Sequence, residues 1–310
     1  MKRTLLLALF AAIGLAACGQ AAKSKKAVEA TNPNTLLWRI SGNGLSKPSY
    51  LFGTMHIICA SDIEISDSLK SAISNSDNVY LELAMDDMMS MLFGAMAHIN
   101  MREDTTLSDL LSPEEYTKVK SYFEKNFNGM LPFKMMERFK PFFTASLLAQ
   151  QGMECESPLS MESLVMEQAK QHEKGIKGLE TVEYQLSIFD SIPYKAQAKQ
   201  LLKMVDESGK KGDDGEMKIL TDAYRNQELN KLDEITKKDE SIGDYTDLLL
   251  YNRNANWANK LSTLMKNKSL VIAVGAGHLP GEKGVINLLR KAGYKVEPVK
   301  NDMIRKGKQI

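Results

Sequence analysis

The stretch LVIAVGAGH, residues 270–278, decides the fold because a short apolar strand sequence runs directly into a glycine-rich exit and a histidine. The stretch SYLFGTMH, residues 49–56, repeats this design near the other end of the chain. Ligands in open α/β sheets bind in the crevice beyond the carboxyl ends of the strands. A glycine at such an exit permits a tight turn that can aim an imidazole into the crevice. The sequence therefore predicts an α/β domain in which His56 and His278 face one site.

The segments around these two stretches complete a sheet. Residues 36–41 and 49–53 flank turn-forming glycines and predict a β-hairpin. A helix is predicted over residues 66–74, and a compact buried strand over residues 79–83. The end of the chain predicts a strand, a helix and a strand at residues 270–274, 285–292 and 294–299.

The middle of the chain has a different pattern. From residue 85 to about residue 174 the spacing is helical, and Ser112-Pro113-Glu114-Glu115 is typical of a helix start. A glycine-bracketed run at residues 175–180 predicts a further strand, and a long helix is predicted from Asp244 to about Asn267. We therefore expect an α/β (mixed α+β) fold, with a central mixed β-sheet and a large helical insertion.

Methionine is concentrated in this helical region. Its thioether side chain fills irregular gaps in a core and also lines adaptable binding surfaces. Core packing and a flexible substrate-facing surface therefore both stay open for these residues. They are Met85, Met88, Met89, Met91, Met96, Met101, Met130, Met135 and Met136.

The N-terminus has the three parts of a secretory signal. Lys2 and Arg3 precede an apolar run that ends at Cys18, too short for the roughly 20 residues of a membrane-spanning helix. The residues Leu15-Ala16-Ala17 before this cysteine resemble a lipobox, at which a thiol is lipidated before cleavage. We expect removal of residues 1–17 and anchoring to a membrane through acyl chains such as palmitate on Cys18. The alternative is an ordinary signal with a cysteine at the cut site.

The rest of the chain divides by composition. Residues 18–35 almost lack large apolar side chains, so we expect the lipidated cysteine to be followed by a flexible tether. Residues 36–300 are expected to form one domain, and residues 301–310 a solvated basic tail. The formal net charge is +1, which gives no reason to expect a nucleic-acid partner.

Cys59 and Cys155 are the two cysteines left after Cys18. An even number of cysteines in an exported protein allows a disulfide, but their spacing fits no recognisable motif. A disulfide and two buried free thiols both stay open.

Two glutamates join the two histidines at predicted strand exits. Glu82 lies one residue before the end of its strand, and Glu180 ends the next one. Two imidazoles with one or two carboxylates suit a divalent transition metal, and a carboxylate outside the metal shell can act as general base in a hydrolysis. Because burial of Glu82 in an apolar run requires a partner, the alternative is a structural salt bridge, for example to Arg253.

Other local patterns indicate less. His98 and His172 lie in polar helical surroundings and are expected to face solvent. The glycines at residues 275–277 lack the Lys-Ser/Thr pair of a phosphate-binding loop.

Five separated motifs follow one another along the domain. They are YLFGTMH (50–56), YLEL (80–83), GLET (178–181), Arg253-Asn254 with Trp257-Ala258, and GAGHLPG (275–281) continued by Gly284-Val285. In these motifs the chain resembles the TraB/GumN family, which includes the Tiki proteins, described as metal-dependent peptidases. The resemblance covers essentially the whole domain and implies a fold related to the erythromycin-esterase and ChaN-like group.

The resemblance also implies one metal-supported site, with manganese or cobalt as the metal. This site contains the two histidines and the glutamates; we expect His56, Glu82 and His278 to hold the metal and Glu180 to be the base or a fourth ligand. Arg253 with Asn254 then positions or polarises the scissile carbonyl group. A thiol ligand from Cys59 would favour zinc instead.

The leading hypothesis is a lipid-anchored, metal-dependent hydrolase, a peptidase that acts on a peptide or protein in the cell envelope. The alternatives are a noncatalytic lipoprotein that binds haem or a peptide through the same histidines, and an envelope interaction protein that merely retains the site. Gly19, in place of an acidic residue after Cys18, favours the outer membrane, with the domain facing the periplasm or the exterior.

Overall fold

The computed structural model describes residues 33–84, 94, 96, 98–127, 132–151, 155, 157–208, 215–238 and 245–304. The predicted signal, the lipidation site at Cys18, nearly all of the tether and most of the basic tail lie outside these residues. Asp244 and the methionines at positions 85, 88, 89, 91 and 130 also lie outside them. Within the part described, no helix has the length and apolar character needed to cross a membrane.

Six strands form the central sheet. Their bounds are β1 Leu37–Ser41, β2 Ser49–Thr54, β4 Asn78–Leu83, β6 Gly175–Glu180, β7 Leu270–Gly275 and β8 Lys295–Pro298. The order across the sheet is β6-β4-β7-β2-β1-β8. β6, β4, β7 and β2 are mutually parallel, whereas β1 is antiparallel to β2 and β8. The predicted mixed α/β class, the central mixed sheet and the opening hairpin are confirmed.

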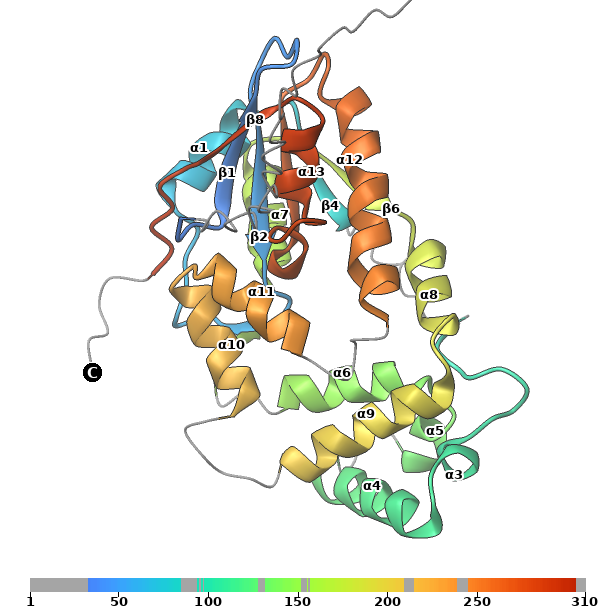
Figure 1. The fold of residues 1–310 in the computed structure, drawn as a ribbon. Coiled ribbons are helices and arrows are strands. Elements are labelled where there is room, and N and C mark those ends of the chain that lie inside the picture. Colours follow the sequence, from blue (N-terminus) through green and yellow to red (C-terminus); the bar gives the residue numbers. More distant parts are fainter. Residues whose placement is uncertain are drawn as a thin grey trace, which may run out of the picture. The chain divides into compact units, whose positions relative to one another are not determined.

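Helices cover both faces of this sheet, which explains the unbroken apolar run in β7. Residues 270–274 are all buried, as expected for a parallel strand that is covered on both sides. α1 (Asp67–Asn75) and α7 (Met161–Gln171) pack on one face, and α12 (Asn252–Leu264) and α13 (Val285–Lys291) on the other (Figure 1).

A second hydrophobic core lies among helices that follow β4 and β6. These are α3 (Leu107–Leu110), α4 (Pro113–Asn126), α5 (Phe133–Met136), α6 (Pro141–Gln151) and α9 (Tyr194–Glu207). α4 begins where the sequence predicts, because Ser112 and Glu115 form a capping box at its start. The large helical insertion is therefore confirmed, and it also continues after β6 (Figure 1).

Five further helical elements belong to the described part of the chain. They are α8 (Val182–Asp190), α10 (Glu216–Arg225), α11 (Leu229–Lys238), a π-helical turn η2 (Asp247–Tyr251) and a 3-10 turn η3 (Ala276–His278).

The long helix predicted to reach Asn267 differs from the structure. In the structure this segment contains the π-helical turn η2, and the regular helix α12 that follows ends at Leu264 rather than at Asn267. The carbonyl group of Leu249, within this turn, accepts a hydrogen bond of 3.0 Å from Nη1 of Arg253. A side chain that binds a helical carbonyl group competes with the regular backbone ladder, and π-helical turns often occur at functional sites.

The described methionines divide between core and surface. Met101 and Met136 are buried, whereas Met96 and Met135 are exposed. Core packing is thus confirmed for Met101 and Met136, whereas a substrate-facing surface stays a prediction.

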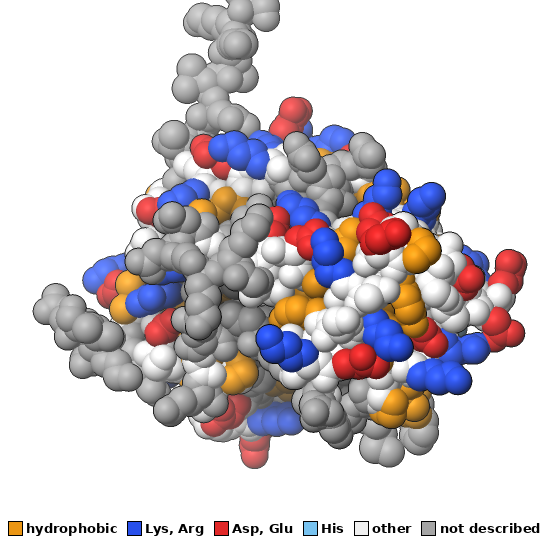
Figure 2. Space-filling model, turned by 90° about the horizontal axis from the view of Figure 1, so that it is seen from below, with side chains coloured by type: hydrophobic (Ala, Val, Ile, Leu, Met, Phe, Trp, Pro, Cys, Tyr) orange, Lys and Arg blue, Asp and Glu red, His pale blue; other side chains and the backbone are white. Residues whose placement is uncertain are grey.

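Charges of both signs are interspersed on the surface. On the face seen in Figure 2, Lys and Arg side chains lie next to Asp and Glu side chains. Ion pairs such as Lys118 with Asp206, 2.7 Å between Nζ and Oδ1, follow from this mixture. Exposed pairs of this kind contribute little to stability.

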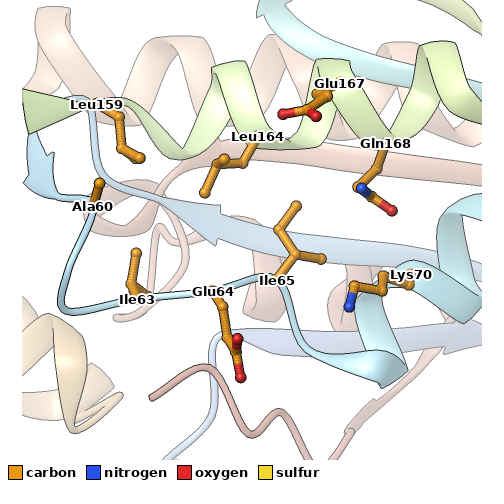
Figure 3. Close-up of a pocket in the computed structure, with 9 residues that line it drawn as sticks. All are labelled: Ala60, Ile63, Glu64, Ile65, Lys70, Leu159, Leu164, Glu167 and Gln168. Carbon is orange, nitrogen blue, oxygen red and sulfur yellow. The ribbon is translucent and has the colours of Figure 1, made fainter. Parts of the chain in front are cut away.

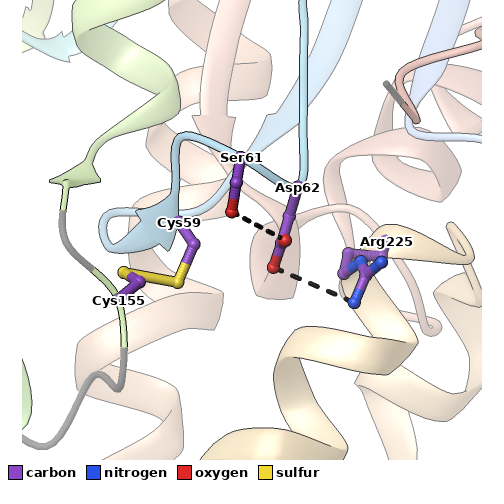
Figure 4. Close-up of a disulfide and its surroundings, with 5 residues drawn as sticks. All are labelled: Cys59, Ser61, Asp62, Cys155 and Arg225. Carbon is purple, nitrogen blue, oxygen red and sulfur yellow. Dashed lines mark hydrogen bonds and ion pairs between the residues drawn. A yellow bond between two sulfur atoms is a disulfide. The ribbon is translucent and has the colours of Figure 1, made fainter. Parts of the chain in front are cut away.

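A disulfide joins Cys59 to Cys155, which settles the two alternatives left open for these cysteines (Figure 4). It lies beside a two-stranded sheet of β3 (Ile58–Cys59) and β5 (Pro158–Leu159). Asp62, three residues after Cys59, contacts Arg225 of α10 at 3.8 Å. The thiol of Cys59 is consumed by the disulfide, so it offers no thiolate to a metal.

Replacement of both cysteines by serine is expected to lower the free energy of unfolding by about 2–4 kcal/mol, because the bond closes a loop between residues 96 positions apart. Urea denaturation followed by circular dichroism measures this loss. Reduced wild-type protein is the matched control and should unfold like the double variant. Equal stability of the oxidised wild type and the variant would contradict the prediction.

Candidate functional site

The exits of β2, β7 and β4 bring the predicted residues together because the three strands are parallel neighbours. β2 and β7 pair in a register that sets Thr54 opposite Gly275, so the turns carrying His56 and His278 leave the sheet side by side. β4, which carries Glu82, pairs with β7 on its other side. The backbone N–H of Gly275 donates a hydrogen bond of 2.8 Å to Glu82 Oε1.

Gly275 marks the point at which the three side chains converge. A Cβ atom at this position would lie 3.3 Å from Glu82 Oε1, 3.5 Å from His278 Cδ2 and 4.0 Å from His56 Nε2. The structure therefore brings together the three residues that the sequence predicts to hold a metal. The glycine leaves room for them, since it carries no side chain.

His278 is buried and its orientation is fixed. Its Nδ1 lies 2.6 Å from Oδ1 of Asn254. The amide nitrogen of Asn254 donates to the carbonyl groups of Lys283 and His278, at 2.9 and 3.3 Å. The amide oxygen is thus the acceptor, which assigns the ring proton to Nδ1 and a lone pair to Nε2. Burial lowers the pKa of His278 to about 4, so its imidazole is neutral near pH 7.

His56 is the exposed member of the site, with 70% of its side chain accessible. Its Nδ1 lies 2.8 Å from Oε1 of the buried Glu162, which also accepts a hydrogen bond of 2.6 Å from Thr54 Oγ1. The hydrogen bond with Glu162 raises the pKa of His56 to about 9. A metal ion at Nε2 would therefore compete with a proton.

Arg253 of α12 connects the site to three strands. Its Nη2 lies 2.6 Å from Glu82 Oε2 and 2.8 Å from Glu180 Oε2, and its Nη1 lies 3.3 Å from His278 Nε2. The guanidinium group also lies over the ring of Trp257, at 4.7 Å. The salt bridge considered for Glu82 is therefore present, within the same cluster as the histidines.

Glu82 is held in its charged form. Burial alone would raise its pKa, but the charges of His278, Arg253 and His56 and the Gly275 hydrogen bond together lower it to about 2. A carboxylate with this surrounding is ionised near pH 7 and can act as an oxygen ligand.

Glu180 and Asn254 are occupied by structural contacts. The carboxylate of Glu180 accepts hydrogen bonds from Arg253, from Trp257 Nε1 at 2.9 Å and from Gln185 Nε2 at 3.1 Å. Asn254 is fully buried and binds His278. The predictions that Glu180 is a base or ligand, and that Asn254 contacts the scissile carbonyl group, stay predictions. The contacts favour positioning roles for both residues.

The donor atoms fit a transition metal in chemistry, and a metal would have to displace a proton only at His56. Both histidines bind an oxygen acceptor through Nδ1 and direct Nε2 toward Glu82, the arrangement common to metal-ligating histidines. As the side chains lie, however, no group of three or more His, Cys, Asp or Glu residues in the described segments has the arrangement of a metal shell. Glu82 Oε2 and His278 Nε2 both contact Arg253 instead.

Sequence reasoning missed Glu162 and Gln185. Glu162 lies in the first turn of α7, where an acidic residue is expected simply because it complements the helix dipole. Gln185 of α8 donates to both Glu82 Oε2 and Glu180 Oε2, at 3.3 and 3.1 Å. Nothing in the local sequence of either residue indicates its partners.

Two further histidines and one cavity are not part of the cluster around Gly275. His98 and His172 are exposed, as predicted. A cavity of about 180 Å³ is lined by Ala60, Ile63, Glu64, Ile65, Lys70, Leu159, Leu164, Glu167 and Gln168 (Figure 3). None of the candidate site residues lines this cavity.

Comparison with known proteins points to one family. The model of the TraB/PrgY/gumN family matches residues 36–298. "Metalloprotease TIKI homolog" of Amphimedon queenslandica is 24% identical, over 85% of this chain and 61% of the relative. "Metalloprotease TIKI1" and "Metalloprotease TIKI2" of Danio rerio are 24% and 22% identical, over 85% and 88% of this chain and 63% and 62% of their own lengths.

The chain thus spans somewhat more than three fifths of the length of these curated relatives. No solved structure matches it, so the expected relation to the erythromycin-esterase and ChaN-like group stays a prediction.

Arg253→Ala is expected to lower the free energy of unfolding by about 3–5 kcal/mol, because it leaves Glu82 and Glu180 buried without their cation. Urea denaturation of metal-free protein measures the effect. Arg39→Ala is the matched control, since 42% of the Arg39 side chain is accessible and it lies 3.8 Å from Glu297, and it should cost less than about 1 kcal/mol. Equal losses in the two variants would contradict the central position of Arg253.

Proposed function

The chain belongs to the TraB/PrgY/gumN family, and on that premise we propose that it is a metal-dependent peptidase, anchored in the cell envelope by a lipid on Cys18. The observation that carries the proposal is the convergence of His56, Glu82 and His278 around Gly275. The names of the similar proteins, metalloproteases, support the same reaction class. Because this chain matches only part of their length, its activity and its peptide or protein substrate are proposed rather than transferred.

His56 and His278 would hold the metal through Nε2, and Glu82 through Oε1. The bound metal would supply Lewis-acid polarisation of the substrate carbonyl group. Two imidazole nitrogens and a carboxylate oxygen suit manganese, cobalt or zinc. The disulfide removes the thiol that would have favoured zinc.

Arg253 would stabilise the negative charge that develops on a carbonyl oxygen during hydrolysis. A guanidinium group held in advance is effective because it needs no reorganisation during the reaction. Glu180, Trp257 and Gln185 support this role, since Glu180 binds the guanidinium and the other two bind Glu180. Asn254 in turn would fix the ring of His278 in the tautomer that leaves Nε2 free of a proton.

A location in the cell envelope would determine which substrates reach this site. We propose that residues 1–17 direct export, that Cys18 carries the acyl chains, and that the domain works at the outer membrane, facing the periplasm or the exterior. Two or more acyl chains give stable anchoring, whereas one gives only marginal binding. The sequence motif before Cys18 supports this part of the proposal.

His278→Ala and His56→Ala are expected to remove the metal from the purified soluble domain and to abolish cleavage of a diverse peptide library. Metal analysis of wild type and variants, prepared with manganese, cobalt or zinc, measures the first effect. His98→Ala and His172→Ala are the matched controls, because both residues are exposed, and they should retain metal and activity.

Negligible metal in the wild type and all variants would contradict the proposal. A haem absorption band that appears on titration and is lost in the site variants, with no peptide cleaved, would replace it with the noncatalytic haem-binding alternative.

Cys18→Ser is expected to prevent incorporation of labelled palmitate in bacterial cells that express the full chain. The measurement is radiolabelling followed by immunoprecipitation. A variant with serine at Cys59 and Cys155 is the matched control and should keep the label, because these cysteines pair with each other. Wild-type protein without label, or label that persists in Cys18→Ser, would disprove lipidation at this cysteine.

A further inference from the structure

Glu162 contacts the exposed histidine of the site from a buried position. Its Oε1 accepts hydrogen bonds from His56 Nδ1 at 2.8 Å and from Thr54 Oγ1 at 2.6 Å. The side chain of Glu162 is 7% exposed, whereas that of His56 is 70% exposed. An exposed side chain ordinarily samples several rotamers, so this bond to a buried carboxylate is what restricts the ring.

The position of Glu162 is itself fixed by links between two segments of the chain. The backbone N–H of Met161, at the start of α7, donates to the carbonyl group of Met55 at 3.0 Å. The pairing of β3 with β5 and the disulfide join the same two segments just beyond this point. Glu162 therefore lies at a constant place relative to the turn that carries His56.

The two histidines of the site share one design. In each, Nδ1 binds a side-chain oxygen of a buried residue, Asn254 for His278 and Glu162 for His56. Each Nε2 lies on the side of the ring toward Gly275 and Glu82. Two independent helices, α12 and α7, supply the two acceptors.

The buried carboxylate of Glu162 has one oxygen without a partner in the described part of the chain. Among the residues described, no group donates a hydrogen bond to its Oε2, although that atom is buried. A buried carboxylate oxygen without a partner costs free energy. Such an exception in a native structure calls for an explanation other than packing.

We propose that Glu162 is a positioning residue for His56, which holds the ring proton on Nδ1 and thereby presents Nε2 to Glu82. The reason for such positioning, a metal bound at Nε2, rests on the proposed function. The tautomer and the direction of the ring do not depend on a metal.

The test compares wild-type protein with Glu162→Ala and Glu162→Gln. Nitrogen-15 NMR of the neutral His56 ring in metal-free protein reports the tautomer, and titration with cobalt ions reports the affinity. Glu162→Ala should move the ring proton to Nε2 and weaken cobalt binding by about 10–100-fold, the usual effect of losing such a partner. The cobalt affinity of Glu162→Gln should lie between those of the wild type and Glu162→Ala, because the amide oxygen of glutamine can still accept a hydrogen bond from Nδ1.

Glu167→Ala is the matched control, since Glu167 is exposed on the same helix and should change neither reading. Thermal unfolding of each variant shows that the compared proteins are folded. An unchanged tautomer in Glu162→Ala would overturn the inference. If the wild type binds cobalt, equal cobalt affinity in the wild type and in both Glu162 variants would also overturn it. A wild type that binds no metal, with the tautomer switched in Glu162→Ala, would instead reject the proposed function and leave the positioning role standing.

Discussion

The buried guanidinium group of Arg253 is the interaction on which the rest of the site depends. It brings α12 onto the exits of β4, β6 and β7 by binding Glu82, Glu180 and His278 together. Burial of charges is costly, and the attraction between them repays that cost only where geometry is excellent and the remaining lone pairs are satisfied. The hydrogen bonds from Trp257, Gln185 and Gly275 meet this requirement.

The sheet imposes the complementary constraint. Because its central strands are parallel, their carboxyl ends meet at one edge, and polar residues placed at those ends must lie close to each other. Two carboxylates at such an edge repel unless a cation lies between them. Arg253 supplies that cation for Glu82 and Glu180, while Glu82 Oε1 is left facing Gly275 and the histidines. A metal ion would therefore share Glu82 with Arg253.

Much of this arrangement could be predicted from the sequence, because its determinants are local. Apolar runs define the strands, and the glycines with His56 and His278 mark their exits. Arg253 could be considered in advance as a partner of Glu82, but the partners Glu162 and Gln185 could not be predicted, since they come from helices far along the chain. Glu162 in the first turn of α7 looks like an ordinary helix start, and Gln185 like a solvated residue of α8. The π-helical turn before α12 was not predicted either; it accompanies a local hydrogen bond, from the side chain of Arg253 to the carbonyl group of Leu249 four residues earlier.

The most direct test of the central claim is a crystal structure of the protein with cobalt or manganese, with an anomalous difference map collected at the absorption edge of the metal. The account predicts one strong peak within coordination distance of His56 Nε2, Glu82 Oε1 and His278 Nε2, next to Gly275. A map without a peak there, with Arg253 still bound to both Glu82 and His278, would contradict it.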